Sequence, residues 1–130
     1  MTTPEWPANA SEAIALQERL RAQVERADRF TRPLRTVAGT DISHPRDSND
    51  VHAAAVVLSL PDLSVREVAF VRTEVTFPYI PWLLAFRELQ PLAAVWARLK
   101  APADLLVVDG HGYAHPRRFG IACHLGLHLD

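Results

Sequence analysis

The segment VHAAAVVLSLPDLSVREVAFVRTEV (residues 51–75) decides the fold, because it holds two strand-like runs joined by a short turn. The first run, residues 51–60, is almost continuously apolar, as in a strand that is buried on both faces. The second run, residues 65–75, alternates loosely between apolar and polar side chains. The link PDLS is too short for a parallel crossover, which needs about a dozen residues, so antiparallel neighbours are expected.

Upstream of this hairpin, the sequence predicts one more strand and one helix. LRTVAGTDI (residues 34–42) is strand-like, and the short polar turn that follows favours a third antiparallel strand. Residues 11–28 have the apolar spacing of an amphipathic helix, with Asn9 or Ser11 as its N-cap. Residues 1–10 contain two prolines and little that could pack, so we expect a flexible tail before a single domain over residues 11–130.

Downstream of the hairpin, the periodicity changes to that of helices. Pro91 is unfavourable inside a helix, which predicts a break near residues 87–90, with Glu88 in it, and a new helix over residues 91–100. DLLVVD (residues 104–109) is a short apolar strand that follows this helix, so it should run parallel to a central strand. A last helix is expected near the C-terminal end. The fold class is therefore α/β, with a mixed sheet of three antiparallel strands and one parallel strand flanked by helices.

The composition is that of an ordinary globular domain of 130 residues, with 48% hydrophobic and 22% charged residues. The formal net charge of −1 gives no global attraction to nucleic acid or to an anionic membrane. With Cys123 as its one cysteine, the chain cannot form an internal disulfide, which fits the cytoplasm. The sequence shows neither a secretory signal nor an apolar run of about 18 residues, so we expect a cytoplasmic protein without a membrane partner.

Three acidic residues stand at the ends or breaks of predicted elements: Asp41, Glu88 and Asp109. Ligands of open α/β sheets collect at the carboxyl ends of strands, so Asp41 and Asp109 would meet if their strands are parallel neighbours. Clustered carboxylates need a cation to remain ionised together, and their oxygens suit Mg²⁺ or Mn²⁺. Such a site is typical of phosphodiester hydrolysis. The alternative is that these acids are ordinary solvent-exposed residues or caps.

Two further segments carry candidate binding residues. In VDGHG (residues 108–112) the glycines allow close approach of the backbone to a ligand, although an ordinary turn is the alternative. His115, Arg117 and Arg118 follow, and the guanidinium groups suit phosphate. In FPYIP (residues 77–81) two prolines hold an aromatic side chain in a stiff loop, as a wedge against stacked bases or as a buried aromatic residue.

Together these segments resemble the endonuclease V family of deoxyinosine 3′ endonucleases. The matching segments are VAGTDIS (37–43), FPYIP (77–81), FRE (86–88), VDGHG (108–112) and HPRRFGIACHLGL (115–127). The resemblance implies a ribonuclease-H-like fold. It also implies a Mg²⁺-dependent DNA-repair endonuclease, with Mn²⁺ as the alternative metal, that hydrolyses the second phosphodiester bond 3′ to a deaminated purine. The alternatives are an endoribonuclease specific for inosine in RNA, and a catalytically weak nucleic-acid-binding remnant.

The resemblance assigns roles to residues only through the matching motifs. It implies that Asp41, Glu88 and Asp109 are catalytic and ligate the metal, and that Tyr79 is the wedge. The expected substrate-binding residues are Tyr79, Pro78, Ile80, Gly110, His111, Gly112, His115, Arg117 and Arg118. The family continues beyond the position of Asp130 into a further strand and helix, so the domain is expected to be C-terminally truncated. We therefore expect self-association, or a partner that covers that side of the sheet.

Overall fold

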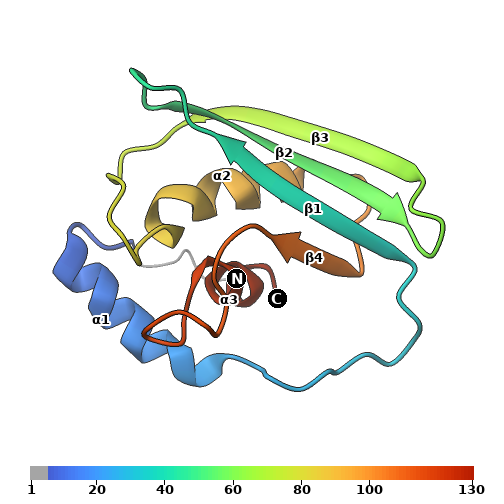
Figure 1. The fold of residues 1–130 in the computed structure, drawn as a ribbon, viewed down its shortest axis with the longest axis horizontal. Coiled ribbons are helices and arrows are strands. Elements are labelled where there is room, and N and C mark those ends of the chain that lie inside the picture. The colour runs from blue at the N-terminus through green and yellow to red at the C-terminus, as the bar shows by residue number, and fades with distance from the viewer. Residues whose placement is uncertain (1–5) are drawn as a thin grey trace.

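The computed structural model describes residues 6–130 and shows helices packed against a four-stranded sheet (Figure 1). The elements are α1 (Ala10–Leu20), the 3₁₀ turn η1 (Arg21–Gln23), β1 (Thr36–Ser43), β2 (Asp50–Ser59), β3 (Val65–Glu74), α2 (Ala85–Ala97), β4 (Leu105–Val108) and α3 (Ile121–Leu129). No helix within the described residues is both long enough and apolar enough to cross a membrane.

The sheet confirms the predicted mixed topology. Its strand order is β3-β2-β1-β4, in which β2 runs antiparallel to both β1 and β3. β4 returns after α2 and pairs in parallel with β1, from Val37 opposite Leu105 to Thr40 opposite Val108. This register places the residues after β4 beside the end of β1, so Asp41 and Asp109 follow paired positions at the same edge of the sheet.

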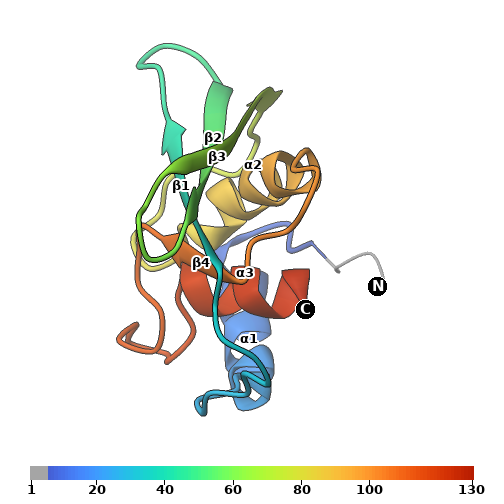
Figure 2. The same ribbon diagram turned by 90° about the vertical axis from the view of Figure 1, so that its right-hand side faces the viewer.

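One face of the sheet is covered by helices and is built from small side chains. Ala38, Ala53, Ala55 and Ala69 are at most 9% exposed and form a core cluster with Val95 of α2. α2 and α3 lie on this side of the sheet (Figure 2), and α3 packs against α2. Because alanine projects only a methyl group, α2 can approach these strands closely.

The opposite face carries large apolar side chains that remain exposed. We call Val65, Val68 and Phe70 of β3 with Val107 of β4 the open-face patch; they are 64%, 61%, 69% and 57% exposed. Along the part of the chain that the structure describes, no strand pairs with the outer edge of β4. An uncovered face beside an unpaired edge is a surface prone to association.

The predicted helix break at Pro91 is wrong, because α2 runs without interruption from Ala85 to Ala97 with Pro91 inside it. Glu88 consequently lies in the first turn of α2 rather than at a break. A proline in a helix removes one backbone hydrogen bond and crowds the preceding turn. Here the Pro91 ring is almost fully buried, and burial of its apolar surface in the core offsets that loss.

The first helix is shorter than predicted. Asn9 caps α1 by accepting from the backbone N–H of Glu12 at 2.9 Å, but the chain leaves helical geometry at Val24. Residues 21–28 present no buried face, so packing does not extend the helix. Trp6 packs on Phe86 with ring centroids 5.5 Å apart, so the flexible tail expected over residues 1–10 does not include it. Residues 1–5 lie outside the described residues.

Candidate active site

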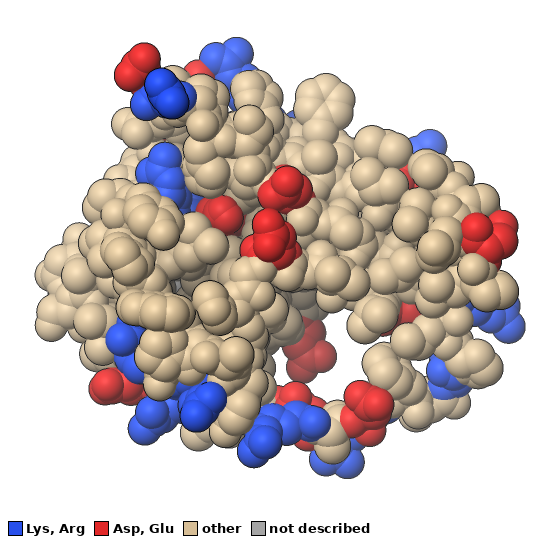
Figure 3. Space-filling model, viewed as in Figure 1, with Lys and Arg blue, Asp and Glu red and all other residues tan. Residues whose placement is uncertain are grey.

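A cavity of about 490 Å³ lies where the ends of β1 and β4 meet the start of α2. Seven of the side chains and backbone positions singled out from the sequence line it: Asp41, Tyr79, Glu88, Asp109, Gly110, His111 and His115. They come from four separate parts of the chain. Figure 3 shows acidic side chains close together near the middle of one face, with most of the basic side chains nearer its margin. The fold therefore gathers the predicted residues around one hollow.

The three predicted carboxylates reach the cavity from three different elements. Asp41 lies near the end of β1, and Asp109 directly follows β4. Glu88 comes from the first turn of α2, and its side chain is only 12% exposed. Asp41 accepts the backbone N–H of Ile42 through Oδ1 at 2.9 Å. The three carboxylates therefore line the same cavity, as the strand topology predicts for Asp41 and Asp109.

The electrostatics of the site show mutual repulsion between these acids. Burial is the main cause that raises the pKa of Glu88, and the negative charges of Asp41 and Asp109 raise it further. His44 acts in the opposite direction, since its Nε2 lies 3.3 Å from Glu88 Oε2. A carboxylate held among like charges is stabilised by a nearby cation.

The donor set fits a hard divalent cation in its chemistry. Asp41, Glu88 and Asp109 offer only carboxylate oxygens, which Mg²⁺ and Mn²⁺ prefer. Among residues 6–130, no group of three or more His, Cys, Asp or Glu side chains already stands in position to hold a metal ion. The carboxylates line one cavity, and ligation would require their side chains to turn toward a common point.

Glycines fix the loop that carries Asp109. Gly110 has a φ of 152°, and a Cβ there would lie 2.4 Å from Ile121 Cγ2. A Cβ on Gly120 would lie 2.1 Å from the carbonyl oxygen of His111, so the loop and the start of α3 touch through backbone. Backbone hydrogen bonds join the same segments, from Gly120 N–H to the Gly112 carbonyl at 3.0 Å. Gly112 itself has room for a Cβ in ordinary contact, so the space around it does not require glycine.

His115 lines the cavity, and both of its ring nitrogens form hydrogen bonds within the protein. Its Nε2 donates to the carbonyl of Trp82 at 2.7 Å, while its Nδ1 accepts the backbone N–H of Arg117 at 3.0 Å. Burial lowers the pKa of His115, which favours this neutral form. The side chain is 3% exposed, so neither ring nitrogen is available to a ligand.

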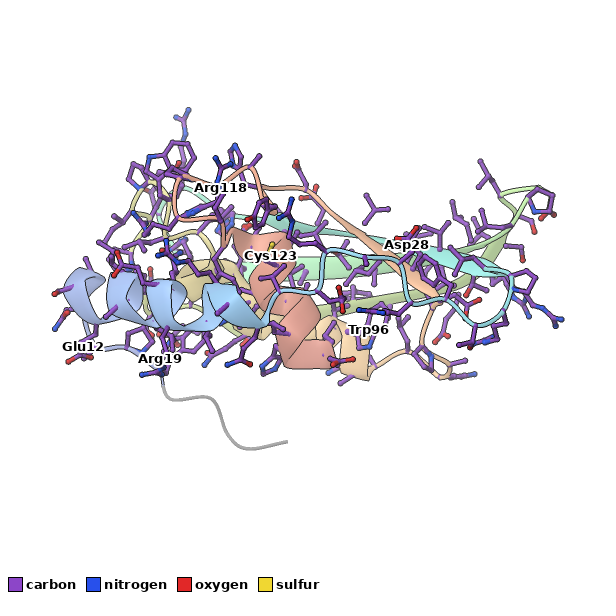
Figure 4. The ribbon with its side chains drawn as sticks, turned by 90° about the horizontal axis from the view of Figure 1, so that it is seen from below. Glu12, Arg19, Asp28, Trp96, Arg118 and Cys123 are labelled. Carbon is purple, nitrogen blue, oxygen red and sulfur yellow. The ribbon has the colours of Figure 1, made fainter. Side chains whose placement is uncertain are left out.

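Arg117 and Arg118 do not line the cavity. Arg117 donates through Nε to Gln17 Oε1 at 2.7 Å and through Nη2 to the Trp82 carbonyl at 3.3 Å. Arg118 lies in the loop before α3 (Figure 4), and its guanidinium stands 5.5 Å from the ring centre of Tyr113. In the same figure Glu12 and Arg19 lie along the side of α1 that faces away from this loop. The structure thus shows contacts of Arg117 within the protein, and the expected contacts of Arg117 and Arg118 with phosphate stay a prediction.

The segment FPYIP (residues 77–81) places its two aromatic residues in different surroundings. Phe77 is buried and packs on Phe86, whereas Tyr79 is 68% exposed and lines the cavity. The alternative interpretation of Tyr79 as a buried aromatic residue in a stiff turn is therefore wrong. Pro78 and Ile80 flank Tyr79 but do not line the cavity.

Sequence reasoning missed several residues of this region. Trp82, Gln17 and Gly120 line the cavity, and His44 pairs with Glu88. Gln17 stands 65 residues from Trp82 and yet donates to its carbonyl at 3.0 Å. No local pattern signals such a contact. The position of His44, shortly after Asp41 at the end of a strand, was the one signal available.

The sheet order, the helices on one face and the acidic cavity at the strand ends define a ribonuclease-H-like α/β protein. Within this class, the chain belongs to the Endonuclease V family, whose family model matches residues 18–130. It is 49% identical to Endonuclease V of Roseiflexus castenholzii over 125 residues, which is 96% of this chain and 55% of that protein. For the Nostoc sp. PCC 7120 protein the identity is 45%, with 57% of that protein covered.

Solved structures of the family show the same fold. The Endonuclease V structure from Streptomyces avermitilis superposes with a TM-score of 0.88 at 44% identity, covering 95% of this chain and 55% of that one. The catalytic domain of human Endonuclease V gives 0.85 at 34% identity, covering 92% and 54%. A Ciona intestinalis Endonuclease V, solved with a 23mer DNA containing an inosine followed by a ribo-adenosine, gives 0.86 at 31% identity, covering 92% and 53%. The chain spans about half the length of the relatives it matches.

Proposed function

We propose that this chain carries the catalytic site of a metal-dependent endonuclease that hydrolyses a phosphodiester bond 3′ to deoxyinosine or another deaminated base in DNA. The observation that carries the proposal is the cavity that Asp41, Glu88 and Asp109 line together with the exposed Tyr79. A relative of similar fold, from Ciona intestinalis, was solved with inosine-containing DNA. Family membership and cavity chemistry therefore support the same substrate class.

The three carboxylates would hold Mg²⁺, with Mn²⁺ as the alternative. The ion, when bound, would supply positive charge for the leaving oxygen and acidify a bound water. The fold would determine the position of the ion. The pairing of β1 with β4 places Asp41 and Asp109 side by side, and α2 places Glu88. The pairing of Glu88 with His44 holds its carboxylate at the cavity wall.

The remaining cavity residues would bind the nucleic acid. Tyr79 is exposed on a loop that two neighbouring prolines stiffen, so it can enter a base stack at a low cost in conformational entropy. Gly110 and His111 line the cavity, where a base displaced from the duplex would be read. His115 keeps the wall rigid through its two hydrogen bonds.

A second candidate is cleavage of inosine-containing RNA. The observation that favours it is the ribo-adenosine that follows the inosine in the nucleic acid bound to the Ciona intestinalis relative. A ribonucleotide differs from DNA at that position by a 2′-OH, which proteins can read as donor and acceptor. Binding without efficient cleavage is the third candidate.

A nicking assay on matched oligonucleotides separates these candidates. The substrates are a DNA duplex with one inosine, the same duplex with adenine, the inosine duplex with a ribonucleotide after the inosine, and an inosine-containing RNA. We expect cleavage of inosine-containing substrates with Mg²⁺, none with a chelator, and loss of cleavage but retained binding in Asp41→Ala. The exposed turn residue Asp62 provides the control Asp62→Ala, which should cleave normally.

The outcome of this assay can also count against the proposal. Equal cleavage by wild type and Asp41→Ala would show that the cavity is not the nuclease site. Binding of inosine-containing substrates without cleavage in any metal would establish the third candidate instead.

A further inference from the structure

Trp82 has a backbone conformation that is rare for a large side chain. Its φ is 68°, in the left-handed region that glycine adopts easily and bulky residues avoid. It follows Pro81 and precedes the buried Leu83, and its own side chain is 47% exposed. An exposed tryptophan kept in a strained conformation at a cavity requires an explanation.

Three hydrogen bonds to one carbonyl hold this conformation. The Trp82 carbonyl accepts from Gln17 Nε2 at 3.0 Å, from His115 Nε2 at 2.7 Å and from Arg117 Nη2 at 3.3 Å. Gln17 is 1% exposed and His115 is 3% exposed, so the anchor is rigid and largely dry. All three bonds end on backbone, and a glycine at position 82 would accept them equally well. The indole is therefore not needed for this anchor.

The indole ring instead forms part of the cavity wall. Its centroid lies 5.3 Å from that of His111, with a tilt of 59° between the ring planes, and 5.6 Å from that of His115, nearly edge-on. Trp82 lines the cavity together with Tyr79 and Asp109. Leu83, 1% exposed, provides the core packing of this segment, so the role of Trp82 is not to fill the core.

We propose that Trp82 is a substrate-binding residue whose indole, backed by His111, stacks on the base that is displaced into the cavity. An aromatic face at the wall of a cavity of about 490 Å³ suits a planar heterocycle, and every nucleobase has a face that can stack on it. Tyr79 and Trp82 then have different roles. The more exposed Tyr79 occupies the gap in the duplex, and Trp82 stacks on the displaced base. This inference rests on the proposed function.

Binding to three duplexes that differ at one position tests the inference. That position carries hypoxanthine, an abasic site or adenine, and affinity is measured by fluorescence anisotropy in chelator, so that no cleavage occurs. We expect wild type to prefer hypoxanthine to the abasic site by about 5- to 150-fold, the range for one stacked base. Trp82→Gly should reduce this preference to about twofold or less, with the affinity for the abasic duplex nearly unchanged.

The glycine variant also separates stacking from folding. Glycine adopts a positive φ readily, so Trp82→Gly should unfold at the same temperature as wild type or higher. Trp82→Phe should retain most of the preference, and Trp82→Leu, which is apolar but not aromatic, should lose it. Trp96→Phe on α2 is the matched control and should behave as wild type. If the glycine variant fails to fold, the leucine and phenylalanine variants decide the question.

The possible failures can be told apart. Equal affinity of wild type for all three duplexes would overturn the proposed function and this inference together. A wild-type preference for hypoxanthine that persists in both Trp82→Gly and Trp82→Leu would overturn the role of Trp82 alone.

Discussion

The cavity and the open-face patch both involve strands of one sheet, but their side chains differ in hydrogen bonding and in exposure. Around the cavity, backbone and side-chain hydrogen bonds fix His115, Trp82 and Gly120, and burial raises the pKa of Glu88 between two other acids. The open-face patch consists of apolar side chains that are more than half exposed, with β4 unpaired at its outer edge in the described part of the chain. Hydrogen bonds and buried charge therefore hold the cavity residues in place, whereas the side chains of the patch lie mainly in solvent.

The largest expected effect is a loss of cleavage on substitution of a cavity carboxylate, with little change in the stability of the fold. Asp109→Asn removes a proposed metal ligand, and because metal binding contributes several kcal/mol to transition-state stabilisation, cleavage should fall by about 10³-fold or more. The same change removes a negative charge near Glu88, so stability to urea should stay within about 1 kcal/mol of wild type. A large loss of stability together with activity would mean that Asp109 is structural.

The next effect concerns the core beneath the cavity, where His124 packs against Phe86 and Phe119. Burial lowers the pKa of His124 from 6.5 to about 4, so the unfolded chain takes up a proton at higher pH than the folded one. The stability that neutral His124 confers is complete above about pH 6.5 and is lost as the pH falls through about 4. The linked loss is about 3 kcal/mol.

Urea unfolding at several pH values measures this loss, with His124→Gln as the comparison that subtracts other titrating groups. We expect the wild-type curve to fall more steeply than the variant curve between these two pH values. Parallel curves would show that His124 is not held neutral by the core.

A smaller effect is expected from the glycine contact that fixes the cavity loop. Gly120→Ala would place a methyl group against the carbonyl of His111, and overpacking of this kind costs about 1–3 kcal/mol. Gly126→Ala is the matched control in the same helix region, because a Cβ at Gly126 meets nothing within 4 Å. Since alanine favours helix over glycine, the control should be stabilised by about 0.5–1 kcal/mol. Thermal unfolding of both variants tests the contact, and equal melting temperatures would contradict it.

The smallest effect on stability is expected in the open-face patch. Phe70→Thr replaces a side chain that is 69% exposed, so the free energy of unfolding should change by about 0.5 kcal/mol or less. Self-association measured by sedimentation velocity should nevertheless decrease, because the largest member of the apolar patch is gone. Unchanged self-association, or a monomeric wild type at all concentrations, would contradict the assignment of this patch to contact.

Much of the fold followed from local sequence, because strand periodicity and link length together determined the topology. The short turns required antiparallel neighbours, and the helix before residues 104–109 required a parallel return, as the pairing of β1 with β4 confirms. Pro91 misled the prediction, since its burial in the core is a tertiary effect that no local rule contains. The length of α1 was overestimated for the converse reason: its helical pattern continues over residues 21–28, none of which is buried.

The site was predictable only where the topology brought residues together. Asp41 and Asp109 could be placed at one edge from strand order alone, and both line the cavity. The position of the Arg117 side chain could not be predicted, because its hydrogen-bond partner Gln17 lies 100 residues away in the chain. The positive φ of Trp82 could not be predicted either. It depends on three donors, distant in the sequence, that bind the Trp82 carbonyl, and the residues next to Trp82 give no sign of them.

The central claim is that Asp41, Glu88 and Asp109 form one metal site, and crystals grown with Mn²⁺ test it most directly. Anomalous scattering should place an ion in the cavity, with carboxylate oxygens of Asp41 and Asp109 within about 2.0–2.6 Å and Glu88 turned toward it. The ion should be absent from crystals of Asp41→Asn. A protein that nicks inosine-containing DNA with Mn²⁺ while the ion binds elsewhere, or while Asp41→Asn keeps it, would contradict the account.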